Sequence, residues 1–258
     1  MSKPTLGGIQ FVRNGIELDY CFEESISCLK ALCDQVIILD VGSTDGTTEI
    51  VKSFEDEKTK VVCLPASEWD KLKGKEMLAH FQNMAKEMLT TDWYFLLQSD
   101  EILHEDCFPA VREAIEKDEE GFFCQRINLW GDSQHQLNVG MDRTPVGTTI
   151  IRLAKTKYYS VGDGEGIYCV ASFEYLNKIR IYHMGFVRDK FIHTKKIEHL
   201  LLRVFGHNDL DPKVIAMNGV FDPFSNFSRE DLMPIQDKLP KFIQQWAEQR
   251  DKINNFEI

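Results

Sequence analysis

Two adjacent carboxylates, Asp100 and Glu101, follow the apolar run Trp93–Leu97. Two like charges side by side repel each other, and a divalent cation that also binds a phosphate would relieve this repulsion. Mg²⁺ and Mn²⁺ typically bind one or two carboxylates, while substrate phosphates and water complete the coordination shell. We therefore predict that Asp100 is a metal ligand, whereas Glu101 could equally cap the next helix.

A second polar segment, residues 40–47, follows the fully apolar run Val36–Leu39. Ligands of doubly wound sheets bind outside the carboxyl ends of the strands. Asp40 stands at such an end, where its carboxylate could accept hydrogen bonds from a ribose or a base. The alternative is a glycine-containing turn in which Asp45 or Thr47 simply caps the following helix.

A third candidate segment, Tyr182–Arg188, closes a late apolar strand. A neutral histidine such as His183 can complete a metal shell, and the guanidinium of Arg188 can bind a diphosphate through two parallel hydrogen bonds. The alternative is a packed histidine beside a surface arginine. The remaining histidines show no spacing typical of metal ligands.

Strand and helix signals alternate through the first half of the chain. Short apolar runs predict strands, and apolar residues three or four positions apart predict helices. The predicted strands are Ile9–Val12, Val36–Leu39, Lys60–Leu64 and Trp93–Leu97, and the predicted helices are Leu18–Leu32, Thr47–Phe54, Lys75–Leu89 and Glu105–Ile115. Repeated β-α-β units with short connections imply an α/β fold, with a Rossmann-like, mostly parallel sheet and helices on both faces.

The second half is less regular. Its predicted elements are two strands that could pair antiparallel (Gly121–Leu129 and Thr148–Ala154), a strand at Asn177–Tyr182, a helix at Lys190–Phe205, a loop at Asp211–Ser228, and one or two helices in Arg229–Arg250, broken near Pro240. We therefore divide one compact domain into a nucleotide-binding half, residues 1–120, and a mixed acceptor half with C-terminal helices, residues 121–258.

The composition indicates a soluble globular protein: 258 residues, 43% hydrophobic, 28% charged, with a net charge of −11. An acidic surface makes nonspecific nucleic-acid binding through a broad basic face unfavourable. The seven cysteines contain no C-x-x-C pair, so we expect reduced thiols in a cytoplasmic protein. We expect neither a signal peptide nor an integral membrane segment, because no apolar run approaches the roughly 20 residues that span a bilayer.

Taken in their order, these segments resemble the motifs of family 2-like glycosyltransferases. Residues 11–14 (F-V-R-N) are similar to the end of the family's first strand, and residues 40–47 to its D-D-G-S-x-D-G-T signature. Residues 81–83 (F-Q-N) resemble its A-R-N segment, and residues 97–101 (L-Q-S-D-E) take the place of its L-D-x-D-(D/E) metal motif. His183 is similar to a late histidine that some of these enzymes use on the same metal.

The resemblance implies a GT-A-type fold, a nucleoside-diphosphate sugar donor, and Mn²⁺ or Mg²⁺ as cofactor. It implies that Asp40 lies by the nucleoside, that Asp100 lies at the metal and the diphosphate, and that His183 is a second metal ligand. The expected donor-binding residues are Phe11, Arg13, Asn14, Asp40, Asn83, Ser99, Asp100 and Arg188.

Three residues depart from the family pattern. Val41 replaces an aspartate that commonly touches the base, which leaves the identity of the base open. Gln98 replaces the first aspartate of the metal motif, which predicts weaker metal binding. Gln82 replaces a common arginine and so removes one phosphate contact.

The catalytic base is expected in the acidic, glycine-rich segment 162–166. Inverting transfer, an expectation from the resemblance, needs a carboxylate within hydrogen-bond reach of the acceptor hydroxyl. Asp163 and Glu165 are the two candidates, and the alternative is an ordinary turn with solvated acids. The acceptor itself cannot be deduced from these residues.

Two other functions compete with sugar transfer. A sugar nucleotidyltransferase would need a glycine-rich basic loop after the first strand, and residues 13–15 (R-N-G) are too few for one. A non-catalytic carbohydrate-binding protein derived from the same fold is the other alternative, and Gln98 in the metal motif keeps it open.

Overall fold

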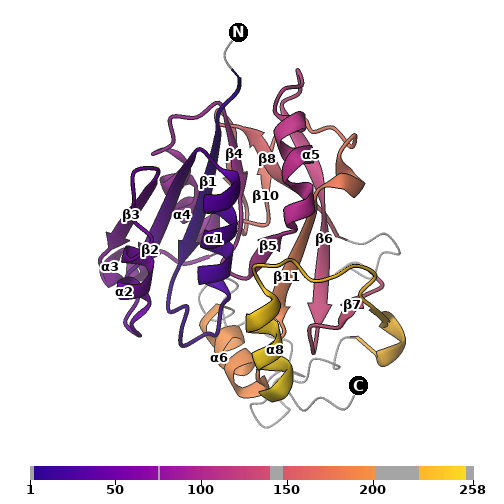
Figure 1. The fold of residues 1–258 in the computed structure, drawn as a ribbon. Helices are drawn as coiled ribbons and strands as arrows, with labels where there is room; N and C mark the ends of the chain where they lie inside the picture. Colours follow the sequence, from indigo (N-terminus) through magenta and orange to yellow (C-terminus); the bar gives the residue numbers. More distant parts are fainter. Residues whose placement is uncertain (1–2, 75, 140–147, 201–226, 254–258) are drawn as a thin grey trace.

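Figure 1 shows the computed structural model, which describes residues 3–74, 76–139, 148–200 and 227–253. The first half contains β1 (Leu6–Val12), α1 (Phe22–Leu32), β2 (Gln35–Val41), α2 (Thr47–Lys52), β3 (Thr59–Leu64), α3 (Ala66–Lys71), α4 (Glu76–Lys86), β4 (Trp93–Leu96), β5 (Glu101–Leu103), the 3₁₀ turn η1 (Glu105–Cys107) and α5 (Phe108–Ala114). The second half contains β6 (Gly121–Trp130), β7 (His135–Leu137), β8 (Thr148–Lys155), β9 (Tyr159–Val161), β10 (Gly166–Tyr168), η2 (Leu176–Lys178), β11 (Arg180–Phe186), α6 (Lys190–Leu200), η5 (Arg229–Asp231), β12 (Leu232–Pro234) and α8 (Gln244–Ile253).

Within the described residues, one large sheet runs in the order β12-β7-β6-β8-β4-β1-β2-β3, and β11 joins it by pairing with β6 and β5. The strands β3, β2, β1 and β4 are all parallel, which confirms the pattern predicted for the first half. β8 runs antiparallel between β4 and β6, so the predicted antiparallel pair in the second half is also confirmed. The expected α/β class with a mostly parallel sheet is therefore correct.

Helices cover both faces of this sheet. Successive side chains of a strand point to opposite faces, so Ile37 and Ile38 belong to different apolar cores. The first core joins β1 and β2 to α1 and α5, and it includes Ile26 and Val111. The second core joins the same strands to α3 and α4. The two cores explain why the run Val36–Leu39 of β2 is apolar at every position.

The C-terminal segment differs from its prediction. Leu232–Pro234 forms a strand that pairs antiparallel with β7, not a helix, and the helix α8 begins only at Gln244. Figure 1 shows α8 beside α6 at one end of the sheet. Arg250 of α8 reaches the loop after β1, where its Nε lies 3.2 Å from the Asp19 carboxylate oxygens.

Several other element boundaries shift. The first helix begins at Phe22 and not Leu18, because the loop before it contains two non-glycine residues, Asn14 and Asp19, with positive φ angles of 48° and 50°. The late strand is Arg180–Phe186, preceded by a 3₁₀ turn, instead of Asn177–Tyr182. The end of the predicted helix Lys190–Phe205 and most of the predicted loop Asp211–Ser228 lie outside the described residues.

All seven cysteines are free, and five of them are buried. In the part of the chain that the structure covers, no helix has the length and apolar character needed to cross a membrane.

Candidate active site

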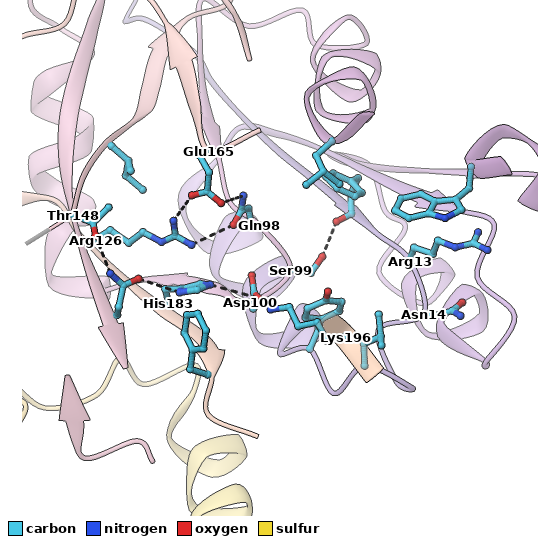
Figure 2. A pocket seen from close by; sticks show the side chains of 18 residues that line it. Arg13, Asn14, Gln98, Ser99, Asp100, Arg126, Thr148, Glu165, His183 and Lys196 are labelled. Carbon is cyan, nitrogen blue, oxygen red and sulfur yellow. Dashed lines mark hydrogen bonds and ion pairs between the residues drawn. The ribbon is translucent and has the colours of Figure 1, made fainter. Parts of the chain in front are cut away.

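A cavity of about 530 Å³ opens where the parallel strands β1 and β4 end. Because parallel strands leave their carboxyl ends at one edge of a sheet, the segments after β1 and β4 meet there. Side chains from β6, β8, β11, α6 and the β9–β10 hairpin complete the walls. The residues labelled in Figure 2 are Arg13, Asn14, Gln98, Ser99, Asp100, Arg126, Thr148, Glu165, His183 and Lys196.

Asp100 lies in the middle of this cavity, next to the cations Lys196 and Arg188 and to the ring of His183. Its Oδ2 lies 2.7 Å from Lys196 Nζ, 3.6 Å from His183 Nε2 and 3.8 Å from a nitrogen of Arg188. Burial raises the pKa of the Asp100 carboxyl, but Lys196, His183 and Arg188 outweigh it and hold this pKa well below the usual range. Asp100 is therefore an anion near neutral pH.

His183 presents its ring to Asp100 in a fixed orientation. Its Nδ1 lies 3.1 Å from Asn128 Oδ1, and the Asn128 amide nitrogen in turn donates to Thr148 Oγ1 at 2.9 Å. This chain of bonds makes Nδ1 the protonated nitrogen and leaves the Nε2 lone pair directed at Asp100. Burial, followed by the charge of Arg126, lowers the pKa of His183, so the ring is neutral.

Glu101 points away from the cavity into the sheet and is completely buried. Its Oε1 lies 2.7 Å from an Arg152 nitrogen and 3.2 Å from Arg126 Nε. Arg126 continues into the cavity, where it forms an ion pair with Glu165 (Figure 2). Buried charges need partners of opposite sign. Glu101 therefore anchors the two arginines beneath the cavity floor and is not a helix cap.

The end of the cavity after β1 is built from Arg13 and an aromatic wall. The Arg13 guanidinium lies 5.0 Å from the centre of the Trp69 ring and donates to the carbonyls of Val41 and Gly42 at 2.6 and 2.8 Å. Figure 2 shows Arg13 and Asn14 at one end and Arg126 and Glu165 at the other, with Asp100 between them.

The sequence model for glycosyl transferase family 2 matches residues 23–180 of the chain. This match covers more than half of the sequence. The chain belongs to glycosyl transferase family 2. It is accordingly a glycosyltransferase, and its mixed sheet flanked by helices is the GT-A-type fold that the resemblance implied.

Two solved structures are distantly similar to this chain. No curated protein matches the chain in sequence. The solved structure of TarS residues 1–349 from S. aureus is 14% identical, with a TM-score of 0.44 over 88% of this chain and 73% of that chain. The mannosyltransferase PcManGT from Pyrobaculum calidifontis, in complex with GDP-Man and Mn²⁺, is 18% identical, with a TM-score of 0.38 over 50% of this chain and 37% of that chain.

Six of the residues predicted from the sequence line the cavity of this family 2 glycosyltransferase: Phe11, Arg13, Asn14, Ser99, Asp100 and His183, and so does the candidate base Glu165. The Ser99 hydroxyl forms a hydrogen bond within the protein, because its Oγ donates to the carbonyl of Phe11 at 2.6 Å.

Asp40 does not line the cavity. It is only 1% exposed, and its Oδ1 accepts hydrogen bonds from the backbone and hydroxyl of Ser43 at 3.1 and 2.6 Å, while Thr48 donates to its Oδ2. The loop is closed so tightly that a Cβ on Gly42, whose φ is +67°, would lie 2.4 Å from the Ala66 Cα. These contacts support the turn interpretation of this segment, but α2 begins after Gly46 without a side-chain cap. A donor contact of Asp40 stays a prediction.

Asn83, Asp163 and Arg188 also lie outside the cavity lining. Both ends of the Asn83 amide bond the backbone of Ser160, at 2.9 and 2.8 Å, so it holds the β9–β10 hairpin. The Asp163 carboxylate accepts from the backbone of Glu165 at 3.3 Å, as in a simple turn. Arg188 lies behind Asp100, where it donates to the carbonyl of Leu18.

Lys196 and Arg126 are cavity residues that the sequence analysis did not identify. Lys196 lies on α6, 13 positions after His183, and Arg126 lies within the strand β6, which the sequence analysis treated only as a strand. The alternation of β6 could have flagged Arg126, because a charged residue within a buried strand must find a partner.

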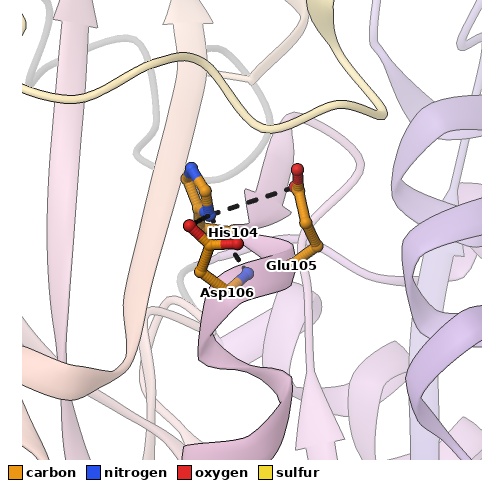
Figure 3. Close-up of side chains that lie close together, drawn as sticks. All are labelled: His104, Glu105 and Asp106. Atoms are coloured by element: carbon orange, nitrogen blue, oxygen red, sulfur yellow. Dashed lines mark hydrogen bonds and ion pairs between the residues drawn. The ribbon is translucent and has the colours of Figure 1, made fainter.

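A second group of potential metal ligands, His104, Glu105 and Asp106, lies at the start of η1 (Figure 3). His104 Nδ1 accepts from the backbone of Asp106 at 3.2 Å, and its Nε2 lies 3.2 Å from the carbonyl of Lys238. Both ring nitrogens are thus engaged. The backbone nitrogen of Lys241 bonds the Glu105 carboxylate at 3.0 Å. His104 therefore caps η1, and the contacts of His104 with Lys238 and of Glu105 with Lys241 hold the C-terminal segment against it.

Proposed function

We propose that this glycosyltransferase moves a sugar from a nucleoside-diphosphate sugar to an acceptor hydroxyl within the 530 Å³ cavity. The observation that carries the proposal is the linear arrangement of an aromatic end, a central anion among cations, and a second carboxylate at the far end. The lining holds three cations (Arg13, Arg126 and Lys196) against two carboxylates, although the whole chain has a net charge of −11. A locally basic cavity in an acidic protein suits a diphosphate.

The donor fits the cavity in one direction. Its nucleoside would lie at the end formed by Phe11, Arg13 and Trp69, where an aromatic surface is available for a base. Its diphosphate would lie beside Asp100, where Lys196 supplies positive charge. The sugar would then face Glu165.

Asp100 and His183 fit a divalent cation. Their facing ligand atoms, Oδ2 and Nε2, are 3.6 Å apart, and the bond from His183 Nδ1 to Asn128 is the outer support that metal-bound histidines usually have. A cation held there would neutralise charge on the leaving diphosphate. The nitrogen ligand favours Mn²⁺ over Mg²⁺. Lys196 shares the same Asp100 oxygen, so the ammonium would move aside when a cation binds.

Glu165 is the proposed catalytic base. It would take the proton of the acceptor hydroxyl while the acceptor oxygen forms a bond to the sugar carbon. Attack from the face opposite the diphosphate breaks the bond between that carbon and the diphosphate oxygen, which leaves as the nucleoside diphosphate, and gives inversion. Burial raises the pKa of Glu165, but Arg126 and then Arg152 and His183 outweigh it, lowering this pKa to about 2. The free carboxylate is therefore ionised but weakly basic. A diphosphate that draws on the charge of Arg126 would strengthen it.

The other functions are less favoured. The family match supports glycosyl transfer over both a sugar nucleotidyltransferase and a non-catalytic carbohydrate-binding protein.

Calorimetry with a panel of nucleoside-diphosphate sugars, with and without Mn²⁺, tests the proposal, followed by measurement of nucleoside diphosphate release. Glu165→Gln should abolish release while donor affinity is kept, and Asp163→Asn is the matched control that should retain it. Binding of no nucleotide sugar, or loss of release in the control alone, would contradict the assignment.

A further inference from the structure

The side chain of Gln98 is directed at the hairpin between β9 and β10. Its Nε2 lies 3.4 Å from both the Gly164 carbonyl and Glu165 Oε1, and its Oε1 lies 3.5 Å from an Arg126 nitrogen. Both ends of the amide are therefore used by the group that holds Glu165 (Figure 2).

The Gly164 carbonyl also accepts from two other buried side chains. Gln82 Nε2 of α4 lies 3.0 Å from it, and Arg152 of β8 lies 3.1 Å from it. Gln82 is 3% exposed and Arg152 is fully buried. Gly164 itself has a φ of +77°, and a Cβ there would lie 2.8 Å from Gln82 Nε2. We call the three donors around this carbonyl (Gln82, Gln98 and Arg152) the Gly164 clamp.

Two of these donors stand where the family resemblance leads one to expect charged residues, an arginine at position 82 and an aspartate at position 98. A carboxylate at position 98 could not donate to the Gly164 carbonyl, and it would place a second negative charge beside Glu165. A neutral amide does the opposite, because it donates to the carbonyl and to the Glu165 carboxylate.

We propose that Gln98 is a positioning residue for Glu165 and not a ligand of the cation. Its amide donates to the Gly164 carbonyl and also to Glu165 Oε1, and this direct contact with the carboxylate orients Glu165 in the cavity. The bonds of Gln82 go instead to the Gly164 carbonyl and to Ser160 Oγ, so Gln82 supports the hairpin but does not orient the carboxylate. This inference rests on the proposed function, because it assigns Gln98 to the base and not to the diphosphate.

The experiment compares Gln98→Ala with Gln82→Ala, a matched control that loosens the same carbonyl without a contact to Glu165. Three quantities are measured on the full chain: hydrogen exchange of residues 160–168, the Kd for Mn²⁺ by calorimetry, and kcat and donor KM for nucleoside diphosphate release with water as acceptor. Exchange should quicken in both variants. Only Gln98→Ala should lose about tenfold or more in kcat, with donor KM and the Mn²⁺ Kd within about twofold of the wild type.

An increase of about tenfold in the Mn²⁺ Kd of Gln98→Ala would make Gln98 a cation ligand and overturn the inference. Equal losses of kcat in the two variants would reduce Gln98 to a general structural role and also overturn it. If the wild type releases no nucleoside diphosphate from any donor, the proposed function fails and the inference fails with it. If the wild type turns over normally, then a raised Mn²⁺ Kd in Gln98→Ala, or equal losses of kcat in the two variants, refutes the inference about Gln98 and leaves the proposed function standing.

Discussion

The carboxyl ends of β2 and β4 make an instructive pair, because each presents an aspartate: Asp40 is the second-last residue of β2, and Asp100 lies in the loop that follows β4. Asp40 turns its carboxylate back onto its own loop, where Ser43 and Thr48 satisfy both oxygens. Asp100 turns its carboxylate into the cavity, where its nearest neighbours are a lysine, a histidine and an arginine. Both aspartates therefore lie near the carboxyl end of a parallel strand, and we expect their roles to differ with the donors that surround each carboxylate.

A second contrast lies within the loop after β4 itself. Asp100 and Glu101 are neighbours in sequence, yet alternation along the backbone sends one to the cavity and the other into the sheet. We expect Asp100 to control chemistry, Glu101 to control stability, and Asp40 to control the shape of its loop. The following predictions test that division.

The largest effect should come from Asp100→Asn. This change removes the central anion of the cavity, and we expect kcat/KM to fall by roughly 10³-fold, or about 4 kcal/mol of transition-state stabilisation. Steady-state kinetics with the donor identified by calorimetry measures it, and circular dichroism checks that the fold is kept. Turnover near that of the wild type would remove the contrast with Asp40.

Glu101→Ala should have the next largest effect, on stability. It leaves the guanidinium groups of Arg126 and Arg152 buried without their shared partner, which should lower the free energy of unfolding by about 3–5 kcal/mol. Urea denaturation measures this loss. Glu101→Gln keeps the shape and one acceptor oxygen, so it should lose less. Equal stability of all three proteins would show that Glu101 is not the anchor.

Much of the fold could be predicted from the sequence, because the apolar runs around Ile37 and Phe95 are too continuous to be anything but buried strands. The helix at Glu76–Lys86 was equally clear from its apolar spacing. The strand at Leu232–Pro234 was missed because it is three residues long and obtains its stability from pairing with β7. Such pairing leaves no local pattern.

The site was predictable only in part. Asp100 and His183 were expected to lie close together because strand ends in a parallel sheet converge, and both do line the cavity. The direction in which a side chain points could not be predicted from the sequence. Asp40 and Asn83 were expected to contact the donor, but in the structure both side chains accept hydrogen bonds from the backbone of the protein. Lys196 could not be found because its approach depends on how α6 packs.

Asp40→Ala should cost about 1–3 kcal/mol in the free energy of unfolding, because three partly buried donors on Ser43 and Thr48 lose their acceptor. Asp40→Asn retains one oxygen and should lose less. Thermal and urea denaturation measure the loss, and the donor KM is determined in parallel. A raised KM with unchanged stability would instead restore Asp40 to the nucleoside site that the resemblance implied, and the contrast with Asp100 would disappear.

The smallest effect should be a shift in pH dependence caused by Arg126→Gln. Burial raises the pKa of Glu165, and the charges of Arg126, Arg152 and His183 together lower it to about 2. Without Arg126 the largest of the lowering charges is gone, so the pKa of Glu165 should rise toward the ordinary glutamate value of about 4.3. A base must be deprotonated to act, so kcat/KM of the variant should begin to fall at a higher pH than that of the wild type. Rate profiles between about pH 3 and 8 measure the shift, because a wild-type carboxyl with a pKa of about 2 stays ionised over this range while that of the variant does not. Arg126→Lys, which keeps the charge, should retain most of the wild-type profile. If the acid limb of Arg126→Gln coincides with that of the wild type, then Arg126 does not govern Glu165, and the acceptor end of the cavity loses its proposed base.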